Sequence, residues 1–78
     1  MKMDIQNFIG KFAEQFETTN ASEIKATTEF KKLGEWSSLI ALSVIAMIDE
    51  EYDVTLKGND IRNANTIEDL FNVVKSKK

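Results

Sequence analysis

Apolar residues near the start of the chain recur at helical spacing. They lie at positions i, i+3, i+4, i+7 and i+11, which form one stripe of an amphipathic helix: Ile5, Phe8, Ile9, Phe12 and Phe16. Asp4 is a suitable N-cap for this helix. The pattern predicts a helix over about residues 4–17, which ends in Thr18-Thr19-Asn20 and places its phenylalanines in the core.

The following segment, residues 18–37, is polar and only weakly periodic. Short turns can begin at residues 22–23 and 27–29, and we expect Phe30 and Leu33 to fold this connection back onto the core. A connection of this length without regular structure is unusual inside a compact domain and often has a function.

A second helix is predicted from Ser37 or Ser38 through Tyr52, and it holds more apolar residues than one face needs. We expect one stripe to face the other helices: Ala41, Val44, Ile45 and Ile48. A second group, rotated away from the first and called the apolar stripe below, consists of Leu39, Leu42 and Ala46. The pattern leaves open whether the long connection buries the apolar stripe or whether it is exposed for a partner or cargo.

The C-terminal third predicts one short helix and one longer helix. Residues 53–59 form a loop with Val54 and Leu56 pointing inward, and residues 60–64 form at most a short helix. Thr66 is expected to cap the last helix, with Asp69 at the third position of a capping box.

The last helix carries one apolar stripe and ends in lysines that suit the negative end of its dipole. The stripe is Ile67, Leu70, Phe71 and Val74, and the lysine tail is Lys75, Lys77 and Lys78. The predicted fold is all-α: a small four-helix bundle with three longer helices, one short helix and a long loop between the first two. Residues 1–78 are expected to form a single domain.

Composition narrows the possible chemistry. The chain has no cysteine and no histidine, which excludes self-contained Ser-His or Cys-His catalysis and removes the commonest metal ligand. So small a chain has little room for the enclosed pocket that an enzyme with catalytic carboxylates would need. We therefore expect no catalytic residue and no metal site. No apolar run reaches membrane-spanning length and no signal peptide opens the chain, so we expect a cytoplasmic protein without membrane insertion. We also expect it to be a monomer.

The net charge of −3 is unevenly distributed. Residues 33–56 contain no Lys or Arg but five acidic residues: Glu35, Asp49, Glu50, Glu51 and Asp53. They form either a solvated acidic face or a docking surface for basic partners. The only basic cluster is the lysine tail, which has no interleaved aromatic residues, so nucleic-acid binding is not expected.

Three segments agree in order and spacing with one known family: Ser38-Leu39, residues 48–54 (IDEEYDV) and residues 65–70 (NTIEDL). Over nearly its whole length the chain therefore resembles the acyl carrier proteins. The resemblance implies that a holo-acyl-carrier-protein synthase transfers a 4′-phosphopantetheine arm from coenzyme A to Ser38. The thiol of that arm would hold acyl groups as thioesters, for delivery to fatty-acid, polyketide or polyene-type synthase enzymes.

The resemblance also implies where partner enzymes bind, namely on the second helix and the loop before it. The partners would be the holo-synthase and acyl-chain-processing enzymes with basic or apolar docking patches. Their expected contacts are Trp36 and Ser37 beside the arm, Leu39, Leu42 and Ala46 as apolar residues, and Asp49 and Glu50 as charged ones. Trp36 has a second interpretation, in which it packs the loop onto the core.

Three residues differ from the family pattern. Ser37 stands where the family has an aspartate, and Ile40 and Ser43 stand where acidic residues are common. Serine still caps a helix, but the negative charge beside Ser38 is lost and two hydroxyls lie side by side. An alternative hypothesis is therefore an unmodified protein–protein interaction module with the carrier fold.

Overall fold

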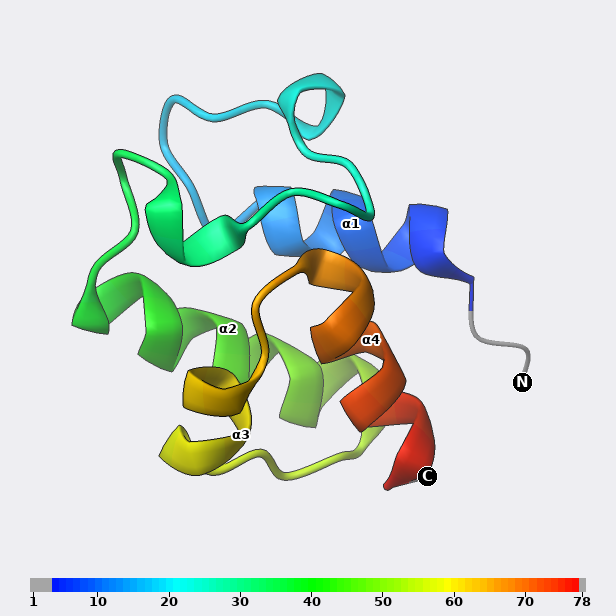
Figure 1. Cartoon of the computed structure of the whole chain (residues 1–78). Helices are drawn as coiled ribbons and strands as arrows, with labels where there is room; N and C mark the ends of the chain where they lie inside the picture. Colours follow the sequence, from blue (N-terminus) through cyan, green and yellow to red (C-terminus); the bar gives the residue numbers. More distant parts are fainter. Residues whose placement is uncertain (1–3, 78) are drawn as a thin grey trace.

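Residues 4–77, which the computed structural model describes, form four α-helices (Figure 1). The helices are α1 (Ile5–Ala13), α2 (Ser38–Tyr52), α3 (Gly58–Asn63) and α4 (Ile67–Ser76). Two 3₁₀ turns, η1 (Ala21–Glu23) and η2 (Phe30–Lys32), lie in the long connection between α1 and α2. The predicted all-α bundle is confirmed. Lys78, part of the predicted lysine tail, lies outside the described residues.

The first helix is shorter than predicted: it ends at Ala13 instead of near residue 17. The N–H groups of Gln15 and Phe16 donate to the carbonyls of Phe12 and Ala13, which tightens the chain into a turn. Glu35 accepts the next three N–H groups, so these donors are not available to extend the helix. Phe16 is nevertheless buried, as its place in the apolar pattern suggested.

The third helix begins at Gly58, two residues before the predicted start. A carboxylate oxygen of Asp60 accepts the N–H of Lys57 at 2.9 Å, and this bond starts the helix early. Val54 and Leu56, in the loop before it, are buried as predicted.

The predicted cap of α4 is confirmed. The hydroxyl of Thr66 accepts the Asp69 N–H, while the Asp69 carboxylate accepts the N–H of Thr66, both at 3.1 Å. Asn65 donates a further N–H to the same carboxylate at 3.1 Å. These bonds to the ionised form lower the pKa of Asp69, chiefly through the backbone of Thr66.

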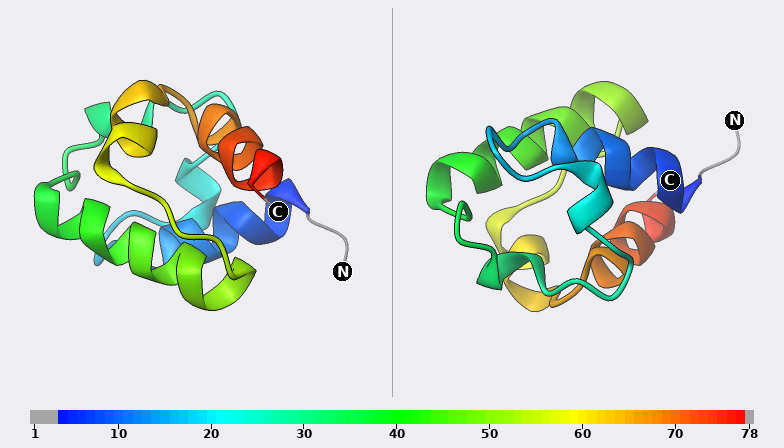
Figure 2. Two further views of the ribbon diagram at one scale, coloured as in Figure 1. Left: turned by 90° about the horizontal axis from the view of Figure 1, so that it is seen from below. Right: turned by 90° about the horizontal axis from the view of Figure 1, so that it is seen from above.

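The core is formed mainly by α1, α2 and α4, whose arrangement Figure 2 shows. It is rich in aromatic rings. Phe8 contacts Phe12 and Phe71, with ring centroids 6.3 and 5.4 Å apart, and so joins α1 to α4. The largest fully buried side chains come from α1, η2, α2 and α4: Phe8, Phe12, Phe30, Ile48, Ile67, Leu70, Val44 and Val74. Burial of these side chains is the main force holding so small a bundle together.

The long connection is attached to the start of α4 rather than being structureless (Figure 1). Glu29 and Thr66 form an isolated antiparallel bridge. Beside it, the N–H groups of Ile67 and Glu68 donate to the carbonyls of Thr28 and Ala26 at 3.1 and 2.9 Å. Two side chains complete the attachment, because Phe30 is fully buried and Leu33 packs against the core, as predicted.

Candidate functional site

The two adjacent serines at the start of α2 have different environments. Ser37 is the N-cap, with an extended backbone, and its hydroxyl oxygen accepts the Ile40 N–H at 3.2 Å. Ser38 is the first helical residue, and its exposed hydroxyl has no hydrogen-bond partner within residues 4–77. Ser37 is therefore engaged in holding the helix end, while Ser38 is accessible for reaction.

Just before the serines, Glu35 binds the segment that follows α1. Its carboxylate accepts the N–H groups of Glu17, Thr18 and Thr19 at 3.1, 3.0 and 2.8 Å, and also the hydroxyl of Thr19 at 2.8 Å. These bonds, led by that to the Thr19 hydroxyl, lower the pKa of Glu35 to about 2. We call this arrangement the Glu35 clamp; it fixes the chain one residue before Trp36.

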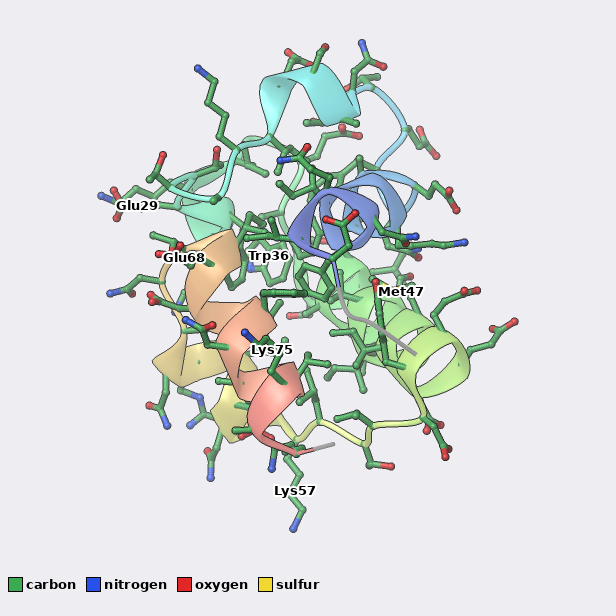
Figure 3. All side chains as sticks on the ribbon, turned by 90° about the vertical axis from the view of Figure 1, so that its right-hand side faces the viewer. Glu29, Trp36, Met47, Lys57, Glu68 and Lys75 are labelled. Carbon is green, nitrogen blue, oxygen red and sulfur yellow. The ribbon has the colours of Figure 1, made fainter. Side chains whose placement is uncertain are left out.

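Trp36 packs on the core from the next position. Its ring stacks on Phe12 with an interplanar angle of 4° and a centroid separation of 6.3 Å. It meets Phe30 edge-on at 5.0 Å. Figure 3 shows Trp36 among the side chains in the interior of the molecule. The ring is half-buried, so the interpretation of loop-to-core packing is confirmed, yet part of it stays accessible beside the serines.

After the serines, α2 presents apolar residues to solvent. Leu39 is 73% exposed and Leu42 is 63% exposed, and Ala46 is exposed as well. Of the other stripe, Val44 and Ile48 are fully buried, whereas Ala41 and Ile45 are half-buried. The question that the pattern left open is thus answered, because the long connection does not cover the apolar stripe.

The acidic residues of α2 divide into two groups. Glu51 pairs with Lys11 of α1 at 3.4 Å. Asp49 and Glu50 are exposed and form no ion pair with the described residues. Glu51 and Glu35 are thus both bound within the molecule. Fewer acidic residues are therefore free to meet a partner than the five counted in residues 33–56.

An open groove of about 660 Å³ lies beside both serines, between η2, α2 and α3; we call it the serine groove. Its apolar lining consists of Trp36, Ala41, Leu42, Ile45 and Ile61. Its charged lining consists of Lys31 and Arg62, without any carboxylate.

The sequence pattern missed both the Glu35 clamp and the two cations of this groove. Glu35 stood out only as part of an acidic window, and no local signal pairs it with residues 17–19. Lys31 and Arg62 lie far apart in sequence and meet only through the fold, where the Lys31 ammonium donates to the Arg62 carbonyl at 2.7 Å.

Comparison with known proteins gives one match. Residues 7–74 match the protein-family model described as a phosphopantetheine attachment site. No curated protein and no solved structure shows a significant match to the chain. Within residues 4–77, no helix combines the length and hydrophobicity needed to cross a bilayer, and no three His, Cys, Asp or Glu side chains are grouped to hold a metal ion.

Proposed function

Because the chain belongs to the phosphopantetheine-attachment family that includes the acyl carrier proteins, we propose that it carries acyl groups on an arm attached to Ser38. The family is defined by a covalently bound 4′-phosphopantetheine, and its domains are generally carriers rather than catalysts. When attached, the arm supplies the thiol that this cysteine-free chain lacks, and the thiol holds the acyl group as a thioester.

The accessible hydroxyl of Ser38 is the observation that carries this proposal. It lies at the N-terminus of a 15-residue helix, where unpaired N–H groups and the helix dipole favour a negatively charged phosphodiester. The serine groove fits the arm, because it opens beside Ser38 and combines an apolar lining with positive charge. Ser37 is the less suitable nucleophile, because its oxygen already accepts the Ile40 N–H.

The loading step consists of one bond exchange on coenzyme A. Ser38 Oγ loses its proton to a base of the holo-synthase and bonds to the phosphorus atom that bears pantetheine. The bond between this phosphorus and the nucleotide oxygen breaks, and adenosine 3′,5′-bisphosphate leaves. This chain contributes the nucleophile and its position, while the synthase contributes the base.

Carrier domains of this family generally interact with modifying enzymes and synthases. We propose that those of this chain process acyl chains in fatty-acid, polyketide or polyene-type synthesis. They would bury the apolar stripe and meet Asp49 and Glu50 with basic groups. Ile40 and Ser43 contribute no charge, so the interface would depend on apolar burial near Ser38 and on electrostatics only farther along α2.

Intact-mass analysis tests the attachment residue. The protein is incubated with coenzyme A and a broad-specificity phosphopantetheinyl transferase, and the wild type is expected to gain one arm. Ser38→Ala should gain none, whereas Ser37→Ala should still gain one. A gain on Ser37→Asp alone would show a site impaired by the missing aspartate. No gain on either the wild type or Ser37→Asp would contradict the carrier function, and a gain on Ser38→Ala would contradict the residue.

A second candidate function is an unmodified interaction module. Ser37 in place of the family's aspartate and the exposure of the apolar stripe favour it. This function requires that the apo protein binds an enzyme of acyl-chain synthesis equally well with and without Ser38→Ala. The carrier function requires instead that the loaded form of the wild type is the one that the enzyme uses.

A further inference from the structure

The serine groove has a charge opposite to that of the whole chain. The chain holds 13 acidic and 10 basic residues, for a net charge of −3. The groove lining nevertheless contains two cations, Lys31 and Arg62, and no carboxylate. A groove of this kind favours an anion with apolar parts.

Neither cation is neutralised by the protein itself. Three ion pairs form within residues 4–77, and they engage Lys11, Lys32 and Lys77. The Lys31 ammonium donates to a neutral acceptor, the carbonyl of Arg62, and so keeps its net charge while joining η2 to the end of α3. The guanidinium of Arg62 has no partner among the described residues.

The Arg62 side chain lies beside Gly58 at the wall of the groove. A Cβ atom at Gly58 would lie 3.7 Å from Nη2 of Arg62, so the guanidinium folds back over the first turn of α3. Gly58 lines the groove as well. The arginine head is therefore at the groove and not directed away from α3.

We propose that Lys31 and Arg62 bind the phosphodiester of the arm and hold the arm in the serine groove between visits to enzymes. This inference rests on the proposed attachment at Ser38. Arginine and lysine form charge-assisted hydrogen bonds with phosphate oxygens. The apolar lining, with Trp36 and Ile61, suits the dimethyl part of the arm.

Trp36 is a built-in reporter for this proposal, because it is the only tryptophan of the chain and lines the groove. Acrylamide quenching of its fluorescence is measured on the apo protein and on holo protein whose mass gain has been verified. The holo form is expected to be quenched less than the apo form. The difference should shrink as salt is added, because salt screens the phosphate–cation attraction.

Two variants and one control identify the cations. Arg62→Met and Lys31→Met should lose most of the holo protection and shift the ³¹P resonance of the phosphodiester, whereas Arg62→Lys should retain part of both. Lys57→Met is the control. It removes the same charge beside α3, but Lys57 does not line the groove and projects away from the molecule in Figure 3.

The outcomes separate this inference from the proposed function. Absence of a mass gain would overturn the attachment at Ser38 and the inference with it. A mass gain with equal quenching of the apo and holo forms would overturn the inference alone. Full holo protection in Arg62→Met and Lys31→Met would exclude the two cations as the phosphate ligands. Arg62→Met is expected to fold, because the guanidinium makes no hydrogen bond or ion pair within the described residues.

Discussion

The residues just before Ser37 and those just after Ser38 use their side chains in opposite ways. Glu35 and Trp36 are bound within the molecule, the first by four hydrogen-bond donors and the second by the rings of Phe12 and Phe30. Leu39 and Leu42 are exposed and contribute little to the core. The first segment holds the start of α2 in place, while the second is free for contact with another molecule.

The largest expected effect comes from a substitution in the first segment, before the serines. Trp36→Ala removes a ring that stacks on Phe12, and we expect a loss of about 2–3 kcal/mol in the free energy of unfolding, less than for a fully buried ring. Urea unfolding followed by circular dichroism measures it. Leu42→Ala is the matched change after the serines and should stay within about 0.5 kcal/mol of the wild type. Equal losses in the two variants would remove the distinction between the segments.

The next effect concerns binding by the second segment. Leu39→Ala and Leu42→Ala should each weaken binding to the holo-synthase by about 1 kcal/mol, which is roughly a fivefold rise in its KM for the carrier. Steady-state kinetics of arm transfer provide the measurement. Asn72→Ala, at an exposed position of α4, is the control. An unchanged KM in both leucine variants would show that the apolar stripe does not contact this enzyme.

A smaller effect sharpens the contrast between the two serines. Ser37→Ala removes the cap of α2 and should lower the free energy of unfolding by about 1 kcal/mol. Ser38→Ala should leave stability nearly unchanged, since its hydroxyl has no partner within residues 4–77. Thermal unfolding of the two apo variants side by side gives the comparison. The reverse order of stability would mean that Ser38, and not Ser37, caps the helix.

The smallest effect is the one that disappears in acid. The folded-state pKa of Glu35 is about 2, below its ordinary value of 4.5, so the clamp contributes its full stabilisation above about pH 4.5. That contribution is lost as the pH falls from about 4.5 toward 2. The unfolding temperatures of the wild type and Glu35→Gln should therefore differ at pH 7 and converge in acid. A constant difference over this range would show that the carboxylate charge is not what holds residues 17–19.

The sequence predicted the parts of the fold that depend on local chemistry. The cap of α4 follows from Thr66 and Asp69, which are three residues apart, and the burial of Val44 and Ile48 follows from helical periodicity. Periodicity also showed that Leu39 and Leu42 lie on another face of the helix. It did not show whether anything covers them, since that depends on the path of the long connection.

Apart from the start of α3, the missed features join segments that are distant in sequence. The end of α1 depends on Glu35, which accepts the N–H groups that a longer helix would have used. The positive charge of the serine groove depends on Lys31 and Arg62, which come from η2 and α3. In sequence each of these residues reads as an ordinary surface charge, so only the packed chain gives them a role.

The attachment of the long connection to α4 affects the order in which the protein matures. Ala26 and Thr28 leave the ribosome well before Ile67 and Glu68, the residues whose N–H groups they accept. On a nascent chain the connection therefore lacks these bonds until α4 emerges, and only the Glu35 clamp and the packing of Trp36 hold the region leading to Ser38. A synthase that recognises the folded surface around Ser38 would consequently load completed chains and pass over unfinished ones, with no separate checkpoint.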